Sequence, residues 1–429
     1  MIAVIVAALA SCSPMDYGAK GNGVADDRAA IQAAIYSCDE IRIPPGHYLL
    51  SKAPFQAFNL HVPASRRIIG GGIEHTVLSQ DVGQTKNVRL LHVDGPDVSI
   101  GGFTLFGDQT SGADEHRAGV FATGAERLSL HHIAARNFTG DGFYIHIGTN
   151  NIILDHVEAY DNDRSGLAFG GGTIGALVIN SKFYANGVQQ IDSEPKGIAT
   201  VDGVTLSNNF VDSGPGNDYA VTVSGSSGLA RSSGWTIVGN EISGGVYVIW
   251  ADGTIVSNNS IINKTTKPCV TVQRRSVGAS ISNNSCLQTQ NLVDGLAAVD
   301  IVGTGATDMP EGISVMNNDV EVMHRAKSFG VSARGTRSVA IIGNKISGPG
   351  GAAIGYAGVF VRTTIIAASC RSAIIVGNEI SSWNYVDVRI AGNTFEGRRA
   401  QIDLVVLGQS NSRVKIDPDV VIVANFERN

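Results

Sequence analysis

Four side chains that can transfer protons lie in two short segments of residues 140–197. Tyr144 and His146 alternate with apolar residues in the first segment, and Asp192 and Glu194 alternate with an isoleucine and a serine in the second. Side chains alternate between the two faces of a β-strand, so each pair is expected on one outward face. A phenol, an imidazole and two carboxylates are groups that serve as general acids and bases. This segment is therefore the predicted catalytic site.

The spacing of the two carboxylates favours glycoside hydrolysis. Asp192 and Glu194 are two residues apart in one strand, which separates their backbones by about 6.5–7 Å. That distance is near the carboxylate separation of inverting glycosidases, in which one acid protonates the leaving oxygen and the other activates water. The first prediction is a polysaccharide-degrading enzyme that holds a glycan in a groove on its outer face.

Two other functions remain open from the residues. A polysaccharide lyase would cleave a uronate polymer by β-elimination, with His146 or Tyr144 as the base. Arg164 or Lys196 would then neutralise the substrate carboxylate. The third function is non-catalytic, a glycan-binding or structural protein such as a tailspike or a surface protein.

Glycines between the two segments suggest where a sugar would lie. Gly170 and Gly171 carry no side chains, so a flat strip there would let a sugar ring approach the backbone. Charged and hydroxyl residues in neighbouring turns complete the expected binding surface. The predicted substrate-binding set is Gly170, Gly171, Asp163, Arg164, Lys196 and Thr222.

Composition excludes some classes of function. The 429 residues carry a net charge of −6, and no basic stripe of a nucleic-acid-binding protein is present. The five cysteines show no metal-ligand spacing, so no metal or cofactor is predicted and the cysteines are interpreted as small buried residues. Cys269 and Cys286 lie in adjacent segments and could meet, although the sequence does not require a bridge.

A repeated pattern accounts for most of the chain. From about residue 98 onward, short apolar segments end in Asn-x-apolar, and a second apolar strand follows each one. The steps between copies, from 15 to 34 residues, centre on the range of about 20–50 residues that is typical of solenoids. The aligned positions are Asn208, Asn240, Asn259, Asn284, Asn318, Asn344, Asn378 and Asn393, with His131, Asp155 and Ser181 in earlier copies. Asparagine tolerates the left-handed backbone of a sharp bend and can hydrogen-bond along a stack, so these residues are predicted to be structural.

The N-terminal residues combine two signals. Residues 1–13 form a short apolar run that is predicted to be an export signal or a cap segment. The run Leu9–Cys12 resembles a bacterial lipoprotein cleavage box, which would place a lipid on Cys12. No stretch is apolar enough to span a membrane, and the protein is expected to be secreted or at the cell surface. Asp26 and Asp27 precede an apolar-faced segment and are expected to cap a helix near residues 26–38.

The segment from residue 16 to about residue 50, with its Tyr-Gly-Ala-Lys-Gly-Asn-Gly and Asp-Asp runs, is similar to the opening of the pectate-lyase-like superfamily. This resemblance implies an all-β fold, a single-stranded right-handed parallel β-helix (solenoid) with a short N-terminal capping helix. We expect one domain over residues 14–429, with an N-terminal cap region at 14–60, coils at 98–412 and a C-terminal cap at 413–429. Members include hydrolases, lyases, epimerases and phage tailspikes, which implies a bacterial or phage-associated protein and a homotrimer as one assembly.

A second resemblance covers about 30 residues of the predicted site. The run Gly-Asp-Gly-Phe-Tyr-Ile-His, with the residues that follow, looks like the corresponding segment of mannuronan C5-epimerase and alginate-lyase-like β-helices. It implies a catalytic role for His146. Three other family positions differ, because this chain has Tyr144 and Gly170 in place of two acids and Asp141 in place of a tyrosine. The resemblance therefore carries over the histidine alone.

Overall fold

The computed structural model describes most of residues 11–348 and, beyond them, the backbone of five strands. The gaps before residue 348 are 55, 82, 84–87, 110–113, 115, 215–218, 227–229, 293–295, 305–306 and 324–328. The chain divides into two compact units, residues 1–191 and 192–429, and each is described by itself. The expectation of one domain over residues 14–429 stays a prediction. Most of the expected export segment, residues 1–10, lies outside the described residues.

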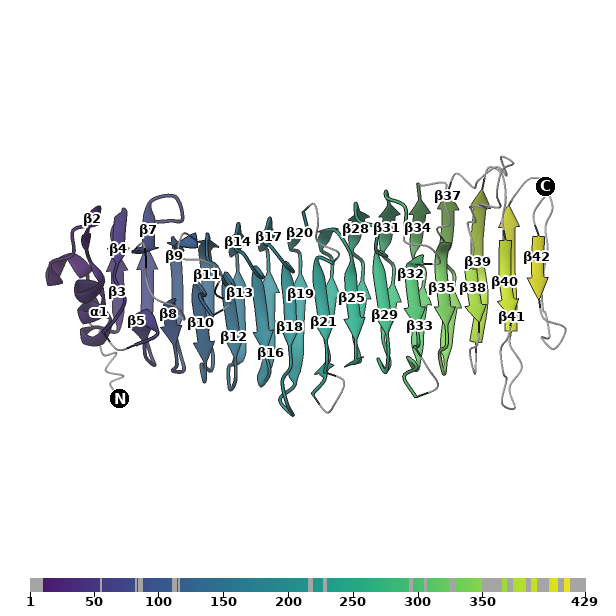
Figure 1. The fold of residues 1–429 in the computed structure, drawn as a ribbon, viewed down its shortest axis with the longest axis horizontal. Helices are drawn as coiled ribbons and strands as arrows, with labels where there is room; N and C mark the ends of the chain where they lie inside the picture. The colour runs from purple at the N-terminus through teal and green to yellow at the C-terminus, as the bar shows by residue number, and fades with distance from the viewer. Residues whose placement is uncertain are drawn as a thin grey trace, which may run out of the picture. The chain divides into compact units, whose positions relative to one another are not determined.

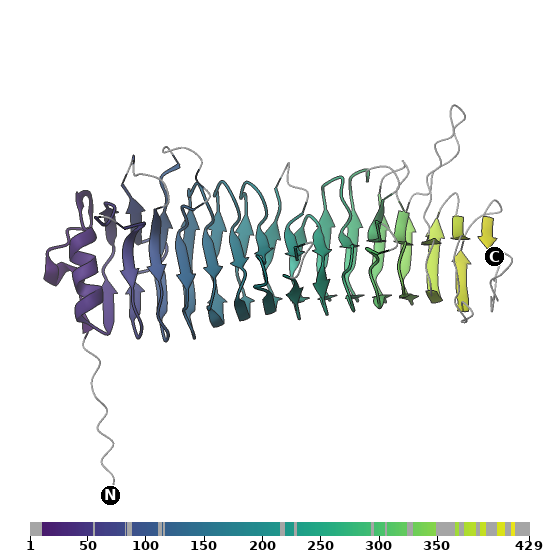
Figure 2. The ribbon, with the colours of Figure 1, turned by 60° about the horizontal axis from the view of Figure 1, so that its bottom comes forward.

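A helix covers the N-terminal end of the first unit, as predicted. Helix α1 (Arg28–Ser37) buries Ile31, Ala34 and Ile35 against the first strands, and Figure 2 shows it lying across that end. The short elements η1 (Pro14–Tyr17) and β2 (Asn22–Asp26) precede it, and β1 (Ser11–Cys12) pairs with β3. The side chain of Asp26 accepts the N–H of Arg28 at 3.1 Å, as expected of a cap, whereas Asp27 takes the N-cap position without a side-chain capping bond. Its buried carboxylate instead accepts the backbone N–H groups of Lys20 and Gly21, at 2.6 and 2.9 Å.

Parallel strands stack coil upon coil in the first unit, as the repeats predict. One stack, visible in Figure 1, comprises β5 (Phe58–Val62), β8 (Arg89–Val93), β10 (Val120–Thr123), β12 (Phe143–His146) and β15 (Leu167–Gly170). A second set comprises β3 (Glu40–Ile43), β6 (Arg67–Gly70), β9 (Ser99–Phe106), β11 (Ser129–Arg136), β13 (Asn150–Asp155) and β16 (Thr173–Ile179). A third set comprises β4 (Gly46–Leu50), β7 (Thr76–Gln80), β14 (Glu158–Tyr160) and β17 (Lys182–Tyr184). Alternate residues of these strands fill the interior, which includes the buried rings of Phe103, Phe143, Phe169 and Phe183.

The second unit repeats the arrangement. One set comprises β18 (Ile191–Glu194), β21 (Val221–Ser224), β25 (Val246–Ile249), β29 (Val270–Gln273), β32 (Ala297–Val302), β35 (Phe329–Arg334), β38 (Ile365–Ala368), β40 (Asp387–Ala391) and β42 (Arg413–Ile416). A second set comprises β19 (Val201–Ser207), β23 (Thr236–Val238), β27 (Ile255–Ser257), β30 (Ser280–Ser282), β33 (Ile313–Met316), β36 (Val339–Ile342), β39 (Ala373–Ser382) and β41 (Gln401–Leu407). The remaining strands are β20 (Phe210–Asp212), β22 (Ser232–Ser233), β24 (Glu241–Ser243), β26 (Ala251–Asp252), β28 (Ser260–Asn263), β31 (Ser285–Gln288), β34 (Asp319–Val322) and β37 (Lys345–Gly348). Strand β42 pairs with β40, so parallel pairing continues past residue 412, and the rest of the expected cap lies outside the described residues.

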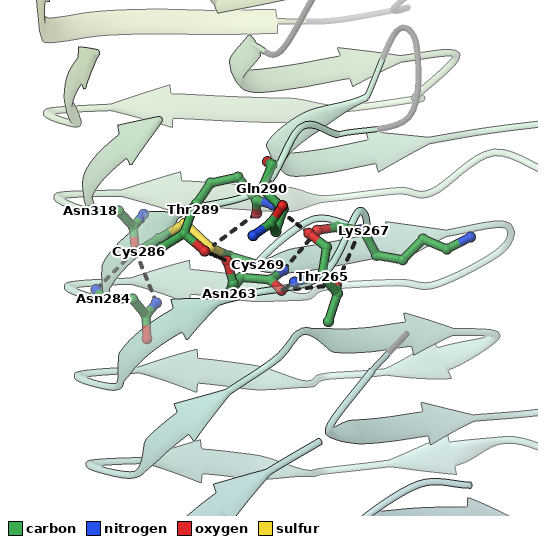
Figure 3. The surroundings of a disulfide bond; sticks show 10 residues. Asn263, Thr265, Lys267, Cys269, Asn284, Cys286, Thr289, Gln290 and Asn318 are labelled. Atoms are coloured by element: carbon green, nitrogen blue, oxygen red, sulfur yellow. Dashed lines mark hydrogen bonds between the residues drawn. A yellow bond between two sulfur atoms is a disulfide. The ribbon is translucent and has the colours of Figure 1, made fainter. Parts of the chain in front are cut away.

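A ladder of buried asparagines connects the coils of the second unit. The side-chain amide of each member donates to the side-chain oxygen of the next, at 2.9–3.0 Å. Figure 3 shows one such pair, Asn284 and Asn318. The described members are Asn209, Asn240, Asn259, Asn284, Asn318 and Asn344. The predicted stacking is confirmed, but the left-handed backbone belongs to the preceding residue, such as Asn283 with φ 55°, and the first member is Asn209 rather than Asn208.

Two disulfides correct the interpretation of the cysteines. Cys12 is bonded to Cys38, and Cys269 is bonded to Cys286, which Figure 3 shows. The Cys12 sulfur is therefore not available for a thioether-linked lipid, and the expected anchor at that residue is wrong for this structure. Among the described residues, no helix has the length and apolar character needed to cross a membrane.

Candidate functional site

Strand β12 places Tyr144 and His146 on its outward face, as its alternation predicts. Phe143 and Ile145 are fully buried, whereas Tyr144 and His146 are half-buried. The centroids of the phenol and imidazole rings are 5.1 Å apart, and the rings are nearly perpendicular, at 87°. Two groups capable of proton transfer therefore lie side by side on one surface.

A column of rings leads to this pair along the outer face of the first unit. Strand register aligns His61, His92, Phe121 and Tyr144 on β5, β8, β10 and β12. Successive ring centroids are 5.9, 5.5 and 5.6 Å apart. This column could not be predicted from the repeats, because these coils lack the Asn-x-apolar signature. The alternating runs Phe-Asn-Leu-His-Val and Arg-Leu-Leu-His-Val carry the signal that would have found it.

A guanidinium group joins the ring column beside Tyr144. The guanidinium carbon of Arg89 lies 4.5 Å from the centroid of the Phe121 ring. Burial lowers the pKa of Arg89, and the charges of Asp114 and Tyr144 act in the opposite direction. Because the Phe121 ring contacts both Arg89 and Tyr144, the guanidinium and the phenol belong to one cluster, although Arg89 was not among the predicted site residues.

The backbone fixes the tautomer of His146. The N–H of Ile147 donates to Nδ1 of His146 at 2.7 Å. A neutral imidazole that accepts at Nδ1 carries its proton on Nε2. In this neutral form Nε2 of the histidine is a hydrogen-bond donor, which differs from the predicted role of a base.

The glycine strip is not open, in contrast to the expectation. Gly170 and Gly171 are both buried. A Cβ atom added to Gly170 would lie 2.5 Å from Cδ2 of His146, so the imidazole occupies that space. Glycine leaves room here for the histidine ring to approach the backbone of the next coil.

Asp163 and Arg164 lie in the turn that precedes β15. Arg164 Nη1 is 3.5 Å from Oδ2 of the fully buried Asp141, whose other oxygen accepts the N–H of Ser165 at 2.9 Å. The side chain of Gln109 donates to Asp163 at 3.2 Å. Asp163 is exposed, yet desolvation raises the pKa of its carboxyl. These contacts connect neighbouring turns, and substrate binding by the two residues stays a prediction.

The other predicted residues belong to the unit that begins at residue 192. Asp192 and Glu194 face outward from β18 and are half-buried, as predicted, whereas Ser193 faces inward. Lys196 is exposed, in a turn where its backbone bonds to Ala199. Thr222 is only 6% exposed, so it does not offer the accessible surface that was expected of it. Its hydroxyl oxygen is also buried without a hydrogen-bond partner.

Among the described residues, no group of three or more His, Cys, Asp or Glu side chains is arranged to hold a metal ion.

Comparison with known proteins supports the fold. Residues 12–82 match the family model for rhamnogalacturonase A/epimerase, pectate lyase-like. The exopolygalacturonase of family 28 from Yersinia enterocolitica is 13% identical, with a TM-score of 0.58 over 97% of this chain and 80% of that one. The tailspike gp61 of Pseudomonas phage phi297 is 11% identical, with a TM-score of 0.54 over 96% and 83%. The chain is a parallel β-helix. The predicted resemblance to pectate-lyase-like proteins is confirmed in its N-terminal segment and its fold.

A curated relative matches part of the chain. Mannuronan C5-epimerase AlgE2 of Azotobacter vinelandii is 31% identical over 237 residues, which is 50% of this chain and 23% of the relative. The chain therefore covers less than a quarter of that relative's length.

Proposed function

We propose that this protein acts on a uronate-containing polysaccharide by removing the proton from C5 of a uronate residue. The observation that carries the proposal is the cluster of Tyr144, His146 and Arg89 on one outer face, with the imidazole proton held on Nε2. The partial likeness to a mannuronan C5-epimerase supports the same substrate class.

Each group of the cluster has a role in this chemistry. The C5 proton lies next to the substrate carboxylate, so the negative charge that develops on proton removal spreads onto the carboxylate oxygens. Tyr144, as a phenolate stabilised by the neighbouring cation Arg89, accepts the proton. The Nε2–H of His146 donates a hydrogen bond to the substrate carboxylate and stabilises the developing charge.

Two outcomes follow from the same first step. In β-elimination, the electron pair of the C5–H bond forms a C4=C5 double bond, the C4–O4 bond breaks, and the leaving oxygen takes up a proton. In epimerisation, a proton returns to C5 from the opposite face. Neither outcome consumes an oxidant or a reductant.

Product analysis distinguishes the proposed function from its alternatives. The full chain is incubated with polymannuronate, polygalacturonate and a neutral glucan, and ultraviolet absorbance and reducing ends are followed. A lyase yields reducing ends with the absorbance of a conjugated double bond, and an epimerase changes the uronate composition without cleavage. Reducing ends without absorbance, or no change in any polymer, would overturn the proposal.

Hydrolysis by Asp192 and Glu194 is the second candidate. The observation in its favour is that both carboxylates face outward from β18 at a two-residue spacing. If hydrolysis occurs, Asp192→Asn and Glu194→Gln abolish the release of reducing ends and Tyr144→Phe does not. A non-catalytic glycan-binding protein, the third candidate, would bind these polymers and leave them unchanged.

We also propose that the protein is secreted or at the cell surface. The two disulfides support this location, because disulfides form and persist in oxidising compartments. A homotrimer stays a prediction.

A further inference from the structure

A tryptophan and an arginine directly follow two neighbouring strands of the second unit, β25 and β29, and lie against each other. Strand register aligns Ser224 with Ile249 and Ile249 with Gln273, so the next residues, Gly225, Trp250 and Arg274, take equivalent places. The guanidinium carbon of Arg274 is 4.5 Å from the centroid of the Trp250 ring. Arg274 thus covers one face of the indole.

The other face of the indole has no counterpart of Arg274 in the preceding coil. The equivalent residue there is Gly225, whose added Cβ would lie 2.3 Å from the backbone oxygen of Trp250 and 2.8 Å from its Cβ. The close approach of the two coils therefore requires glycine, which leaves no side chain at that position to stack on the ring. Among the described residues, Arg274 is the cation that stacks on the Trp250 ring. The Trp250 side chain is half-buried.

Both residues have an unusual backbone. Trp250 has φ 50° and Arg274 has φ 55°, in the left-handed region that glycine and asparagine favour. A bulky residue in this region suggests a role for its side chain beyond the turn itself. The stacked indole and guanidinium of these two residues are the groups that such a role would involve.

The surroundings of the indole carry a local excess of positive charge. Arg274 Nη1 is 3.5 Å from Asp308, and Arg231 Nε is 2.6 Å from Asp252. Arg275 is exposed, and no carboxylate among the described residues forms an ion pair with it. Arg231 also donates to the backbone oxygen of Arg275, so three arginines and two aspartates gather here, in a chain whose net charge is −6. The Nε atom of Arg274 is also buried without a hydrogen-bond partner.

We propose that Trp250 and Arg274 form a binding subsite for a carboxylated sugar residue of a polysaccharide. The indole provides a flat apolar surface for the C–H face of a pyranose ring. The guanidinium groups of Arg274 and Arg275 provide hydrogen bonds and charge for the sugar carboxylate. The subsite binds glycan without performing chemistry, so it goes beyond the proposed reaction and stands whether or not Tyr144 is catalytic.

Titration calorimetry with defined oligosaccharides tests the subsite. The full chain carrying Tyr144→Phe is used as the parent protein to prevent turnover, with saturated hexamannuronate, hexagalacturonate and neutral mannohexaose as probes. Ultraviolet absorbance of the same samples reports separately whether Tyr144→Phe still reacts. Trp250→Gly and Arg274→Asn suit the left-handed backbone, so both variants are expected to keep the parent melting temperature. Arg337→Gln is the matched control, because it also removes one arginine charge from the second unit. Arg337 pairs with Glu311 at 3.0 Å and is not part of the proposed subsite.

Trp250→Gly and Arg274→Asn are expected to weaken binding of an oligouronate by about tenfold each. Arg337→Gln is expected to bind like the parent, and mannohexaose is expected to bind more weakly than the uronates. The proposal is overturned if Trp250→Gly binds as tightly as the parent. It is also overturned if Arg337→Gln loses as much affinity as Arg274→Asn, or if the neutral sugar binds equally well.

Discussion

At the proposed site of the first unit, the role of each side chain depends on its immediate neighbours. The alternation around Tyr144 and His146 was enough to predict that both face outward, because strand geometry follows directly from sequence. The protonation pattern of His146 could not be predicted, because it depends on a backbone N–H donated by Ile147. Arg89 was missed for a related reason, since its place beside Phe121 arises from stacking between coils.

If His146 acts through its Nε2–H group, a substitution that keeps an N–H donor should be tolerated better than one that removes it. His146→Gln keeps an N–H donor on the side chain and should retain more activity than His146→Ala, which we expect to lose activity by about 10²-fold or more. Initial rates on polymannuronate or polygalacturonate measure the difference. His75→Ala, which removes an exposed histidine of the same unit, should leave the rate unchanged. Equal loss in the glutamine and alanine variants would mean that His146 acts as a base rather than as a donor.

Gly170→Ala tests the contact between the glycine and the imidazole. The new methyl group would overlap Cδ2 of His146, which can move because it belongs to a flexible side chain. We therefore expect activity to fall severalfold while the melting temperature changes by only a few degrees. Initial rate and thermal unfolding are measured on the same sample. Full activity with a displaced melting curve would show that Gly170 serves the fold alone.

At the scale of the elements, the repeated asparagines predicted the coils. They did not show which asparagine of each turn forms the left-handed bend and which forms the buried hydrogen bonds. The pattern Asn-x-apolar identified the stack of coils, and the left-handed bend was assigned to the same asparagine. The structure divides the two tasks, because Asn283 has φ 55° and Asn284 forms the buried ladder. A one-residue difference of this kind depends on which side chain faces the interior, which the pattern alone does not specify.

The ladder predicts unequal costs for two adjacent asparagines. Asn284→Ala removes hydrogen bonds to Asn259 and Asn318 and leaves buried polar groups without partners, which should lower the free energy of unfolding by about 2–3 kcal/mol. Asn283→Gly is the matched control, because glycine accepts the left-handed backbone, and it should change stability by less than about 1 kcal/mol. Urea unfolding measures both. A larger loss of unfolding free energy in Asn283→Gly than in Asn284→Ala would show that Asn283, and not Asn284, carries the stabilising hydrogen bonds.

A buried ion pair between β32 and β35 gives the stability a pH dependence. Burial raises the pKa of the fully buried Asp300 from 3.8 to about 6, although Arg334 lies 3.0 Å from the carboxylate and acts in the opposite direction. A pKa that is higher in the folded state means that the folded protein binds this proton more tightly than the unfolded chain. The stabilisation is therefore complete below the unfolded pKa and is lost as the pH rises to about 6.

Comparison with Asp300→Asn isolates this contribution. The difference in unfolding free energy between the parent protein and the variant should fall by roughly 2–3 kcal/mol between about pH 4 and pH 6 and stay constant above that range. Denaturant unfolding of both proteins across this range measures the difference. A difference that rises with pH in that interval would show that Arg334 outweighs the effect of burial.

For the whole molecule, the fold was predictable and the candidate site only in part. Repeats of about 20–50 residues require stacked coils, because a single coil cannot bury its own apolar side chains. Tyr144 and His146 were found from local alternation, whereas the ring column from His61 to Phe121 arises from contacts between distant residues. Only the possible meeting of Cys269 and Cys286 could be read from the sequence, and the bond between Cys12 and Cys38 could not, since pairing depends on which segments meet.

The fate of the C5 hydrogen during reaction in D2O tests the central proposal most directly. Polymannuronate and polygalacturonate are incubated with the parent protein and with Tyr144→Phe, and the uronate C5 position is followed by NMR. We predict that the parent removes the C5 hydrogen, leaving either deuterium at C5 or a new C4=C5 double bond, and that Tyr144→Phe does so at least 10²-fold more slowly. New reducing ends that retain the original C5 hydrogen, or equal rates in the two proteins, would contradict the account.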